Sequence, residues 1–350
     1  MEADGLITPT GVLLAPPGIA EADWHTVRAG GIGGSDVAGI LGLDRWSSPW
    51  KVWAAKTGRT GGTADNEDMR MGRRLEAPIA EEWAERTGCQ LLPPVGTLAH
   101  AEWLWMRANV DRLVQEARAA AATAEPVIGP LEVKNRNWRA AAEWGDDVPD
   151  EPALQLHWYL AVTGYPVGWV CALIGGNRLR WYRVERDQEL IDHLIAYCGD
   201  WWERHVVGGE QPPADGSRAT TELLAHLWEA EPEATVEVDA SRTLQLLAHR
   251  ARLKEQLAAL DGELAVVENE LKAALGTAEV ALIGGRTAYT WVANGTFRSK
   301  DFRAEHPELA AEYVKQATVL DLARLAEDHP DIHRRYRARQ LRVPTKGALS

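Results

Sequence analysis

Leu131-Glu132-Val133-Lys134 is the stretch that decides the fold of this chain, and the upstream Asn109-Val110-Asp111 completes its meaning. The apolar residues around it predict a buried β-strand, in which successive side chains point to opposite faces. Glu132 and Lys134 therefore share one face, while Val133 points into the core. Charged side chains on a buried strand need a counter-charge or a function. The pattern favours a small charged site on this strand.

Metal-assisted hydrolysis of a phosphodiester fits these residue types. Carboxylate oxygens of Asp111 and Glu132 are the hard ligands that Mg²⁺ prefers, and two such ions about 4 Å apart can stabilise the attacking and leaving oxygens. Lys134 would orient or deprotonate the attacking water. A structural salt bridge is the alternative, because Glu270-Leu271-Lys272 repeats the same spacing on a predicted helix whose charges face solvent.

Glu76 is a third candidate acid. On its predicted helix it shares a face with the apolar Ile79 and Trp83. A carboxylate on an apolar helix face is costly unless a positive charge meets it. A role at a metal is therefore open. The alternatives are a charge placed near the helix N-terminus, or an ion pair with Arg73 or Arg74.

A glycine-rich turn, Gly30-Gly31-Ile32-Gly33-Gly34-Ser35-Asp36, precedes a short apolar run. With Ser35 as the N-cap, the exposed amides of a helix start would cradle a phosphate, and Arg28 could add a charge-assisted fork on the same anion. A plain capped turn is the alternative. There is no GxxxxGK[ST] motif, and no GxGxxG follows a predicted strand, which disfavours a nucleotide-driven motor or a dinucleotide enzyme.

Composition sets wider limits on the class of protein. The chain has 350 residues, 45% of them apolar and 25% charged, which is typical of a folded soluble protein. A net charge of −13 argues against blanket adhesion to nucleic acid or membranes. No apolar stretch reaches the roughly 20 residues of a membrane helix, and no signal peptide is visible, so we expect a cytoplasmic protein without membrane association. Cys89, Cys171 and Cys198 lie too far apart to predict a disulfide framework or a CxxC zinc site.

Helix punctuation is clear at several places. Ser48 is a predicted N-cap before Pro49, and Gly58 lies past the end of that helix. Three further helices are expected, near residues 66–87, over Glu151–Val162 and over Asp187–His205. Pro78 predicts a kink or a fresh start inside the first of these.

The strands are predicted from runs rich in β-branched and aromatic residues. Two are expected at Trp103–Val114 and Val127–Asn135, separated by an Ala-rich loop. Two more, Val167–Ile174 and Arg178–Glu185, flank Gly175-Gly176-Asn177, which is the composition of a tight hairpin.

A domain boundary is predicted within 208–217, which concentrates Gly, Pro and polar residues. Beyond it, a seam of apolar residues spaced alternately by four and three predicts a coiled coil or helical hairpin. Its members are Leu253, Leu257, Leu260, Leu264, Val267 and Leu271. A second hairpin, Val280–Ile283 with Thr287–Val292, and weak helices follow.

Six short motifs now stand in order along residues 21–206. They are Trp24-His25-Thr26-Val27-Arg28, Gly33-Gly34-Ser35-Asp36-Val37, Met71-Gly72-Arg73-Arg74-Leu75-Glu76, Asn109-Val110-Asp111, Leu131-Glu132-Val133-Lys134, and Gln155 with Tyr159-Leu160-Ala161-Val162-Thr163-Gly164. Each is weak alone. In this order and spacing the chain resembles the YqaJ and lambda exonuclease group of phage recombination nucleases, within the PD-(D/E)XK superfamily.

The resemblance implies an α/β fold with a restriction-endonuclease-like core, in which helices flank a mixed central sheet. The residues beyond this core predict a C-terminal helical, coiled-coil and β-hairpin appendage. The implied division is an N-terminal extension over 1–20, a nuclease domain over 21–207, a linker over 208–219 and the C-terminal region over 220–350.

The implied site residues have separate roles. Asp111, Glu132 and the carbonyl of Val133 match the metal ligands, and Glu76 matches a helix glutamate near the metals. Lys134 matches the superfamily lysine, and Gln155 completes the catalytic set. Arg28 and Ser35 match positions that hold the 5′-phosphate of the strand being degraded.

The implied activity is a Mg²⁺-dependent exonuclease with two ions, for which Mn²⁺ could substitute. It would resect linear double-stranded DNA ends from 5′ to 3′ and leave 3′ overhangs for a single-strand annealing protein. A homo-oligomer is also implied, and a trimeric ring is one such arrangement. Alternatives are an endonuclease of the same fold and a catalytically silent DNA-binding module that recruits a recombinase.

The chain departs from the family pattern in two places. His157 stands where relatives often have a second glutamine, and we interpret it as a packed or hydrogen-bonded residue. The part after residue 215 is absent from the compact lambda-type enzyme. It ends in a basic stretch, Asp331–Ser350, which could follow DNA phosphates or form a solvated helix beside acidic neighbours.

Overall fold

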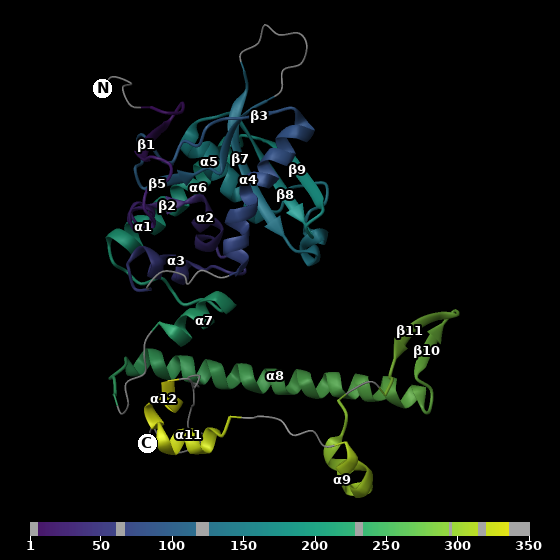
Figure 1. Cartoon of the computed structure of the whole chain (residues 1–350). Coiled ribbons are helices and arrows are strands. Elements are labelled where there is room, and N and C mark those ends of the chain that lie inside the picture. Colours follow the sequence, from purple (N-terminus) through teal and green to yellow (C-terminus); the bar gives the residue numbers. More distant parts are fainter. Residues whose placement is uncertain are drawn as a thin grey trace. The chain divides into compact units, whose positions relative to one another are not determined.

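The computed structural model describes residues 6–60, 67–116, 126–227, 234–293, 296–313 and 320–335. The chain forms two compact units, Met1–Glu229 and Ala230–Ser350 (Figure 1). The first unit contains all the site residues named above. The predicted Ala-rich loop falls mainly on 117–125 and the basic stretch mainly on 336–350, so both lie largely outside the described residues.

A five-stranded mixed sheet forms the centre of the first unit. Its order is β3-β6-β7-β8-β9, and only the β7–β8 pair is parallel among the pairs described. The strands are β3 Gln90–Leu91, β6 Arg112–Gln115, β7 Ile128–Arg136, β8 Val167–Ile174 and β9 Arg178–Glu185. The β8–β9 hairpin has the predicted bounds, because Gly175 and Gly176 both take the positive φ that such a tight turn requires.

Helices cover both faces of this sheet. Leu131, Val133 and Cys171 pack with Ile79 and Trp83 of α4, Glu67–Thr87. The alternate residues Val170, Ala172 and Ile174 pack in the other cluster, which holds α5, Asp150–Thr163. Since side chains alternate along a strand, α4 and α5 lie on opposite faces. This is the mixed sheet flanked by helices that the restriction-endonuclease-like class predicts.

A second sheet of order β1-β4-β5-β2 lies in the same unit. Its strands are β1 Gly11–Ala15, β2 Ile32–Gly33, β4 Thr97–His100 and β5 Met106–Asn109. The prediction of one strand over Trp103–Val114 is therefore wrong: β5 belongs to this sheet and β6 to the other. The chain changes sheets at Val110-Asp111, where the Asp111 carboxylate bonds to the backbone of β7 instead of continuing β5.

The predicted helix after Ser48 is confirmed as α3, Pro49–Lys56, with the Ser48 hydroxyl accepting from the Lys51 amide at 3.1 Å. No fresh helix start occurs at Pro78, because α4 is a single 21-residue helix. Pro78 lies on its exposed side, where water can satisfy the carbonyl that proline leaves without a donor. The remaining helices of this part are α1 Glu21–Ala29, α2 Gly34–Ile40, the 3₁₀ turn Trp138–Glu143, and α6 Gln188–Trp201 continued by a π-helical turn over Trp202–Val207.

The segment predicted as a linker is bonded to the first unit. The Trp50 indole donates to the Pro212 carbonyl at 2.7 Å, and the Thr220 hydroxyl donates to Ser48 at 2.8 Å. Thr220 also bonds to Asp215 at 3.0 Å, and α7, Arg218–His226, packs against α3. The first unit accordingly extends to Glu229 rather than ending at 207.

The second unit is dominated by α8, Ala240–Leu275, a single helix of 36 residues that contains the predicted seam. The hairpin of β10, Val280–Ile283, and β11, Arg286–Thr290, follows. Four short helices complete the described part: α9 Ser299–Glu305, α10 Pro307–Glu312, α11 Leu322–Asp328 and α12 Pro330–Arg335. Among the described residues of the whole chain, no helix has the length and apolarity needed to cross a membrane.

Candidate active site

Strand pairing brings Asp111 beside Glu132. In the antiparallel β6–β7 ladder Arg112 lies opposite Leu131, so Asp111, one residue before β6, falls next to Glu132. The Asp111 carboxylate accepts a 2.8 Å hydrogen bond from the Val133 amide, which fixes its position against β7. The two acids, 21 positions apart in the sequence, are therefore neighbours because of sheet register.

Lys134 links β7 to α5 through its ammonium group. It contacts the Glu132 carboxylate at 2.8 Å, donates to the Gln155 carbonyl oxygen at 2.7 Å and contacts Glu151 at 3.1 Å. An ammonium has three N–H donors, and here each has a partner. Glu132 and Lys134 lie on one face of β7, as the alternation predicts, and both are largely buried.

One face of α5 completes this cluster. Glu151, Gln155 and Tyr159 are spaced by one helical turn, and the Gln155 amide donates to the Tyr159 hydroxyl at 2.8 Å. Glu151 also pairs with Arg136 at 2.7 Å. The sequence analysis did not single out Glu151; its i, i+4 relation to Gln155 is the signal that could have found it.

Glu76 reaches the same region from α4. Its carboxylate pairs with the Arg112 guanidinium at 3.2 Å, and this partner comes from β6 rather than from its own helix. The Glu76 carboxylate is thus paired with the residue that follows Asp111. That contact brings the α4 glutamate to the β6–β7 acids.

The three acids perturb one another. Burial, and then repulsion from Glu132 and Glu76, raises the pKa of Asp111 well above its ordinary value. Burial raises the pKa of Glu132 despite the opposing charge of Lys134. Burial and the Glu132 charge raise the pKa of Glu76 against the effect of Arg112. Burial is the largest cause for each of them, so these surroundings favour the neutral form of all three acids.

These residues fit a divalent cation. The second oxygen of the buried Glu132 carboxylate has no hydrogen-bond partner, and such an orphaned acceptor is costly. The available donors are hard carboxylate oxygens, which suit Mg²⁺. Within the described ranges no three His, Cys, Asp or Glu side chains converge in metal-binding geometry. One oxygen each of Asp111, Glu132 and Glu76 is engaged by a protein donor instead.

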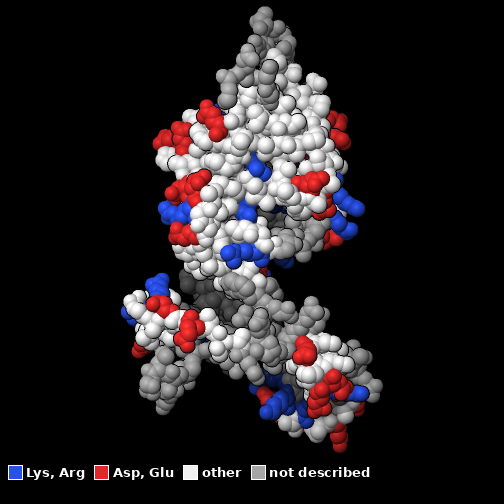
Figure 2. All heavy atoms as spheres, turned by 90° about the vertical axis from the view of Figure 1, so that its left-hand side faces the viewer, with Lys and Arg blue, Asp and Glu red and all other residues white. Residues whose placement is uncertain are grey.

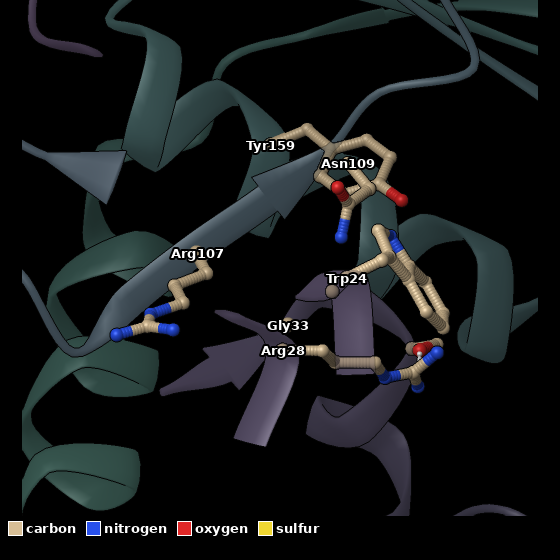
Figure 3. A pocket seen from close by; sticks show the side chains of 8 residues that line it. Trp24, Arg28, Gly33, Arg107, Asn109 and Tyr159 are labelled. Atoms are coloured by element: carbon tan, nitrogen blue, oxygen red, sulfur yellow. Dashed lines mark hydrogen bonds between the residues drawn. The ribbon is translucent and has the colours of Figure 1, made fainter. Parts of the chain in front are cut away.

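A pocket of about 140 Å³ lies beside the acids (Figure 3). Its lining residues are Trp24, Arg28, Gly33, Gly34, Ser35, Arg107, Asn109 and Tyr159. Arg28 stands on α1 with its guanidinium 5.3 Å from the Trp24 ring, and it donates to the Ser35 hydroxyl at 2.9 Å. In Figure 3, Arg107 lies on the side opposite Arg28 and Trp24. The two residues predicted to bind phosphate thus meet in one pocket.

The cap of α2 differs from the prediction. Gly33 is the N-cap residue, and its amide donates to the Asp36 carboxylate at 2.9 Å, so Ser35 lies inside the first turn. Asp36, rather than Ser35, accepts from the Gly33 amide. Its carboxylate is held in place by ion pairs with Arg28 at 3.4 Å and with Lys56 at 2.7 Å. Ser35 is left with its hydroxyl directed to Arg28.

Lys56 is a buried residue that the sequence analysis did not find. Its side chain is only 3% exposed, and besides Asp36 it contacts the Arg28 carbonyl oxygen at 3.0 Å. Although burial opposes ionisation of Asp36, the charges of Lys56 and Arg28 hold its pKa below the ordinary value. The Lys56–Asp36 pair therefore anchors the helix that carries Arg28 to the start of α2.

Tyr159 connects the pocket to the acids. It lines the pocket and bonds to Gln155, whose other end holds Lys134. Close approach of α2 to α5 makes this possible, because a Cβ on Gly34 would meet Tyr159 at 2.7 Å. His157, in contrast, is packed as expected and pairs its Nδ1 with the Ala153 carbonyl at 2.9 Å.

Charge on the surface of the first unit is mixed. On the face shown in Figure 2, basic and acidic side chains are interspersed among the coloured residues. The mixture of charges on this face agrees with the negative net charge.

A family model and a curated relative both match this chain, and both are of the YqaJ type. The model of the YqaJ-like viral recombinase domain matches residues 23–166. The chain is 31% identical over 303 residues to "Uncharacterized protein YqaJ" of Bacillus subtilis (strain 168), covering 85% of this chain and 91% of that protein.

Among solved structures, similarity is found to LHK-Exo, an alkaline exonuclease from Laribacter hongkongensis. Identity is 18% and the TM-score 0.42, over 53% of this chain and 93% of that one. A phage-related exonuclease from Haemophilus somnus 129PT matches at 11% identity and a TM-score of 0.34, over 53% of this chain and 100% of that one.

Proposed function

The chain belongs to the YqaJ family, and from this premise and the site geometry we propose that it is a divalent-metal-dependent deoxyribonuclease that resects linear double-stranded DNA from its ends. The observation that carries the proposal is the set of acids beside Lys134: the buried Glu132, with its orphaned oxygen, and the half-buried Asp111 and Glu76. A structural salt bridge alone would not require two further acids.

Asp111, Glu132, the Val133 carbonyl and Glu76 are the residues that would hold the metal, Mg²⁺ or alternatively Mn²⁺, with two ions in the full site. When bound, the ions supply positive charge that stabilises the attacking and leaving oxygens of a phosphodiester. Hydrolysis of this kind needs no nucleotide. One oxygen of each acid bonds to a protein donor, and the second carboxylate oxygen is left to bind an ion.

Lys134 orients the attacking water in this proposal. Its ammonium is held by Glu132, Glu151 and Gln155, so its position is set before substrate arrives. Tyr159 holds Gln155 in turn. To donate to the water, the ammonium exchanges one of these three contacts for it, while the other two keep it in place.

Arg28 and Ser35 would bind the 5′-phosphate of the DNA end. The guanidinium is stacked on Trp24 and bonded to Ser35, and its remaining N–H groups are available to an anion. Because Tyr159 lines this pocket and also bonds to the Lys134 network, an end phosphate bound here would place nearby phosphodiesters at the acids. This arrangement favours 5′ to 3′ resection over internal cleavage.

Resection from the 5′ strand leaves a 3′ single-stranded overhang. We propose that a single-strand annealing protein takes over this product, in the cytoplasm of a bacterial or phage-infected cell. The active form is proposed to be a homo-oligomer, for which a trimeric ring around the duplex is one arrangement.

The test is digestion of a linear duplex labelled at its 5′ end beside a covalently closed circle, each with and without Mg²⁺ or Mn²⁺. Metal-dependent degradation of the linear duplex alone supports the proposal. Nicking of the circle would instead identify an endonuclease. Retention of the linear duplex without cleavage, in either metal, would identify a DNA-binding module.

A further inference from the structure

Helix α8 presents an apolar stripe to solvent along most of its length. Leu257, Leu260 and Leu264, at the middle of the stripe, are 60%, 60% and 57% exposed. Leu246, Leu253, Val267 and Leu271 continue the same alternating spacing of four and three and are exposed as well. The stripe therefore runs over Leu246–Leu271, roughly 40 Å at the rise of an α-helix. A stripe of this period and length is the seam of a coiled coil.

The described part of the second unit offers no helix that could cover this stripe. Its other helices, α9 to α12, have six or seven residues each. Covering a stripe of this length takes a helix comparable to α8 itself. A second copy of the chain supplies such a helix, with a self-complementary surface.

We propose that α8 pairs antiparallel with α8 of a second copy, so that the chain dimerises through a two-stranded coiled coil. In this register Leu257 packs against Leu260 of the second copy, and Leu253 against Leu264. Leu246 meets Leu271 at each end. The leucines of the stripe then face leucines of the second copy, while Val267 meets Arg250.

Charged residues choose the antiparallel direction. Arg250 occupies a seam position, and a parallel, in-register pair would place it against Arg250 of the second copy. The parallel pair would also set Glu263 beside Glu268 of the second copy, in the flanking positions. Like charges in these positions disfavour that pairing.

The antiparallel register removes both conflicts. Arg250 then faces Val267 of the second copy, so its stem packs on an apolar side chain while the guanidinium reaches solvent. Lys254 faces Asp261 of the second copy, and the dyad repeats this attraction. Glu263 faces Gln256 rather than an acid.

A matched pair of substitutions tests the seam in the full chain. Leu260→Glu lies in the stripe, whereas Val266→Glu lies off it, on a side chain of similar exposure at 58%. By light scattering after size-exclusion chromatography, Leu260→Glu should halve the particle mass while Val266→Glu keeps the wild-type mass. Circular dichroism checks that both remain helical. A wild-type protein that runs as a 38.5 kDa monomer, or a Leu260→Glu variant of unchanged mass, overturns the proposal.

A charge swap tests the direction of pairing. Lys254→Glu should weaken the dimer about tenfold, because two attractive pairs become repulsive. The double variant Lys254→Glu/Asp261→Lys should restore wild-type affinity. In a parallel pair Lys254 would instead face His249, so the single variant would not weaken the dimer and the second change would rescue nothing. Sedimentation equilibrium distinguishes the two patterns, and the parallel pattern refutes the antiparallel register.

The inference is independent of the proposed catalysis. The dimer test has particle mass as its readout, and DNA digestion by the same variants reports separately on the first unit. Loss of the dimer with digestion intact separates the two roles.

Discussion

At the scale of single residues, Lys134 is the side chain on which chemistry depends most directly. Lys134→Ala should reduce hydrolysis of a linear duplex by about 1,000-fold or more, because it removes the donor beside the acids. DNA affinity, measured by fluorescence anisotropy without catalytic metal, should stay within a few-fold of wild type. Lys51→Ala, which removes a lysine whose ammonium donates to the Trp46 carbonyl in the same unit, is the control. A Lys134→Ala enzyme of wild-type rate would remove this residue from the mechanism.

In the proposed mechanism, Arg28 would govern the choice of DNA end. Arg28→Ala should abolish any preference for 5′-phosphorylated over 5′-hydroxyl duplexes, because the guanidinium is the charged group directed at Ser35 in the pocket. The ratio of initial rates on the two substrates measures this. If the ratio is the same in variant and wild type, the phosphate is read elsewhere.

Asp36 carries a pH-dependent share of stability. Its folded-state pKa lies below the ordinary value of 3.8, so the carboxylate contributes stability that is present above pH 3.8 and is lost as pH falls through the folded pKa. Asp36→Asn should destabilise the protein by about 3–5 kcal/mol at pH 7, since Lys56 is left buried and unpaired. The gap between variant and wild type in urea unfolding should narrow only below pH 3.8. A gap that is constant down to pH 2.5 would contradict the pairing.

At the scale of elements, local patterns predicted more than long-range contacts. The cap of α3 and the β8–β9 hairpin follow from Ser48 and from Gly175-Gly176, whose effects reach only a few residues. The break between β5 and β6 could not be predicted, because it depends on an amide 22 residues away in β7. Glu76 was identified as a site residue from its helix face, but its partner Arg112 lies 36 residues away.

Some residues of the candidate site stand out in the sequence, and others only in the folded chain. Glu132 and Lys134 were predictable because a charge on a buried strand conflicts with its neighbours. Lys56 was not, since Lys at the end of a short helix is ordinary in sequence and only the fold places it against Asp36. Glu151 likewise gains its meaning when α5 packs on β7.

The contact between α2 and α5 gives an element-scale prediction. Gly34→Ala would bring a Cβ to 2.7 Å from Tyr159 and 3.0 Å from Gln155, so the helices must separate. We expect a loss of about 1–3 kcal/mol in unfolding free energy and a lower rate of DNA hydrolysis, because Gln155 holds Lys134. Gly72→Ala is the matched control within a helix: its Cβ would meet nothing within 4 Å, and it should stabilise the protein by up to about 1 kcal/mol. Equal stability of the two variants would show that the helices are not in close contact.

At the scale of the whole molecule, the position of the domain boundary decides which fragment folds. A fragment of residues 1–229 keeps α7 and the bonds from Pro212 and Thr220 to α3, whereas a fragment ending at 207 lacks them. Removing the segment loses two buried hydrogen bonds, at about 1 kcal/mol each, together with the packing of α7 on α3. For a unit of this size such a loss lowers the melting temperature by roughly 5–10 °C. Differential scanning calorimetry of the two fragments measures the difference. Equal melting temperatures would mean that the segment after 207 contributes nothing to the first unit, and the boundary expected from its Gly and Pro content would then be correct.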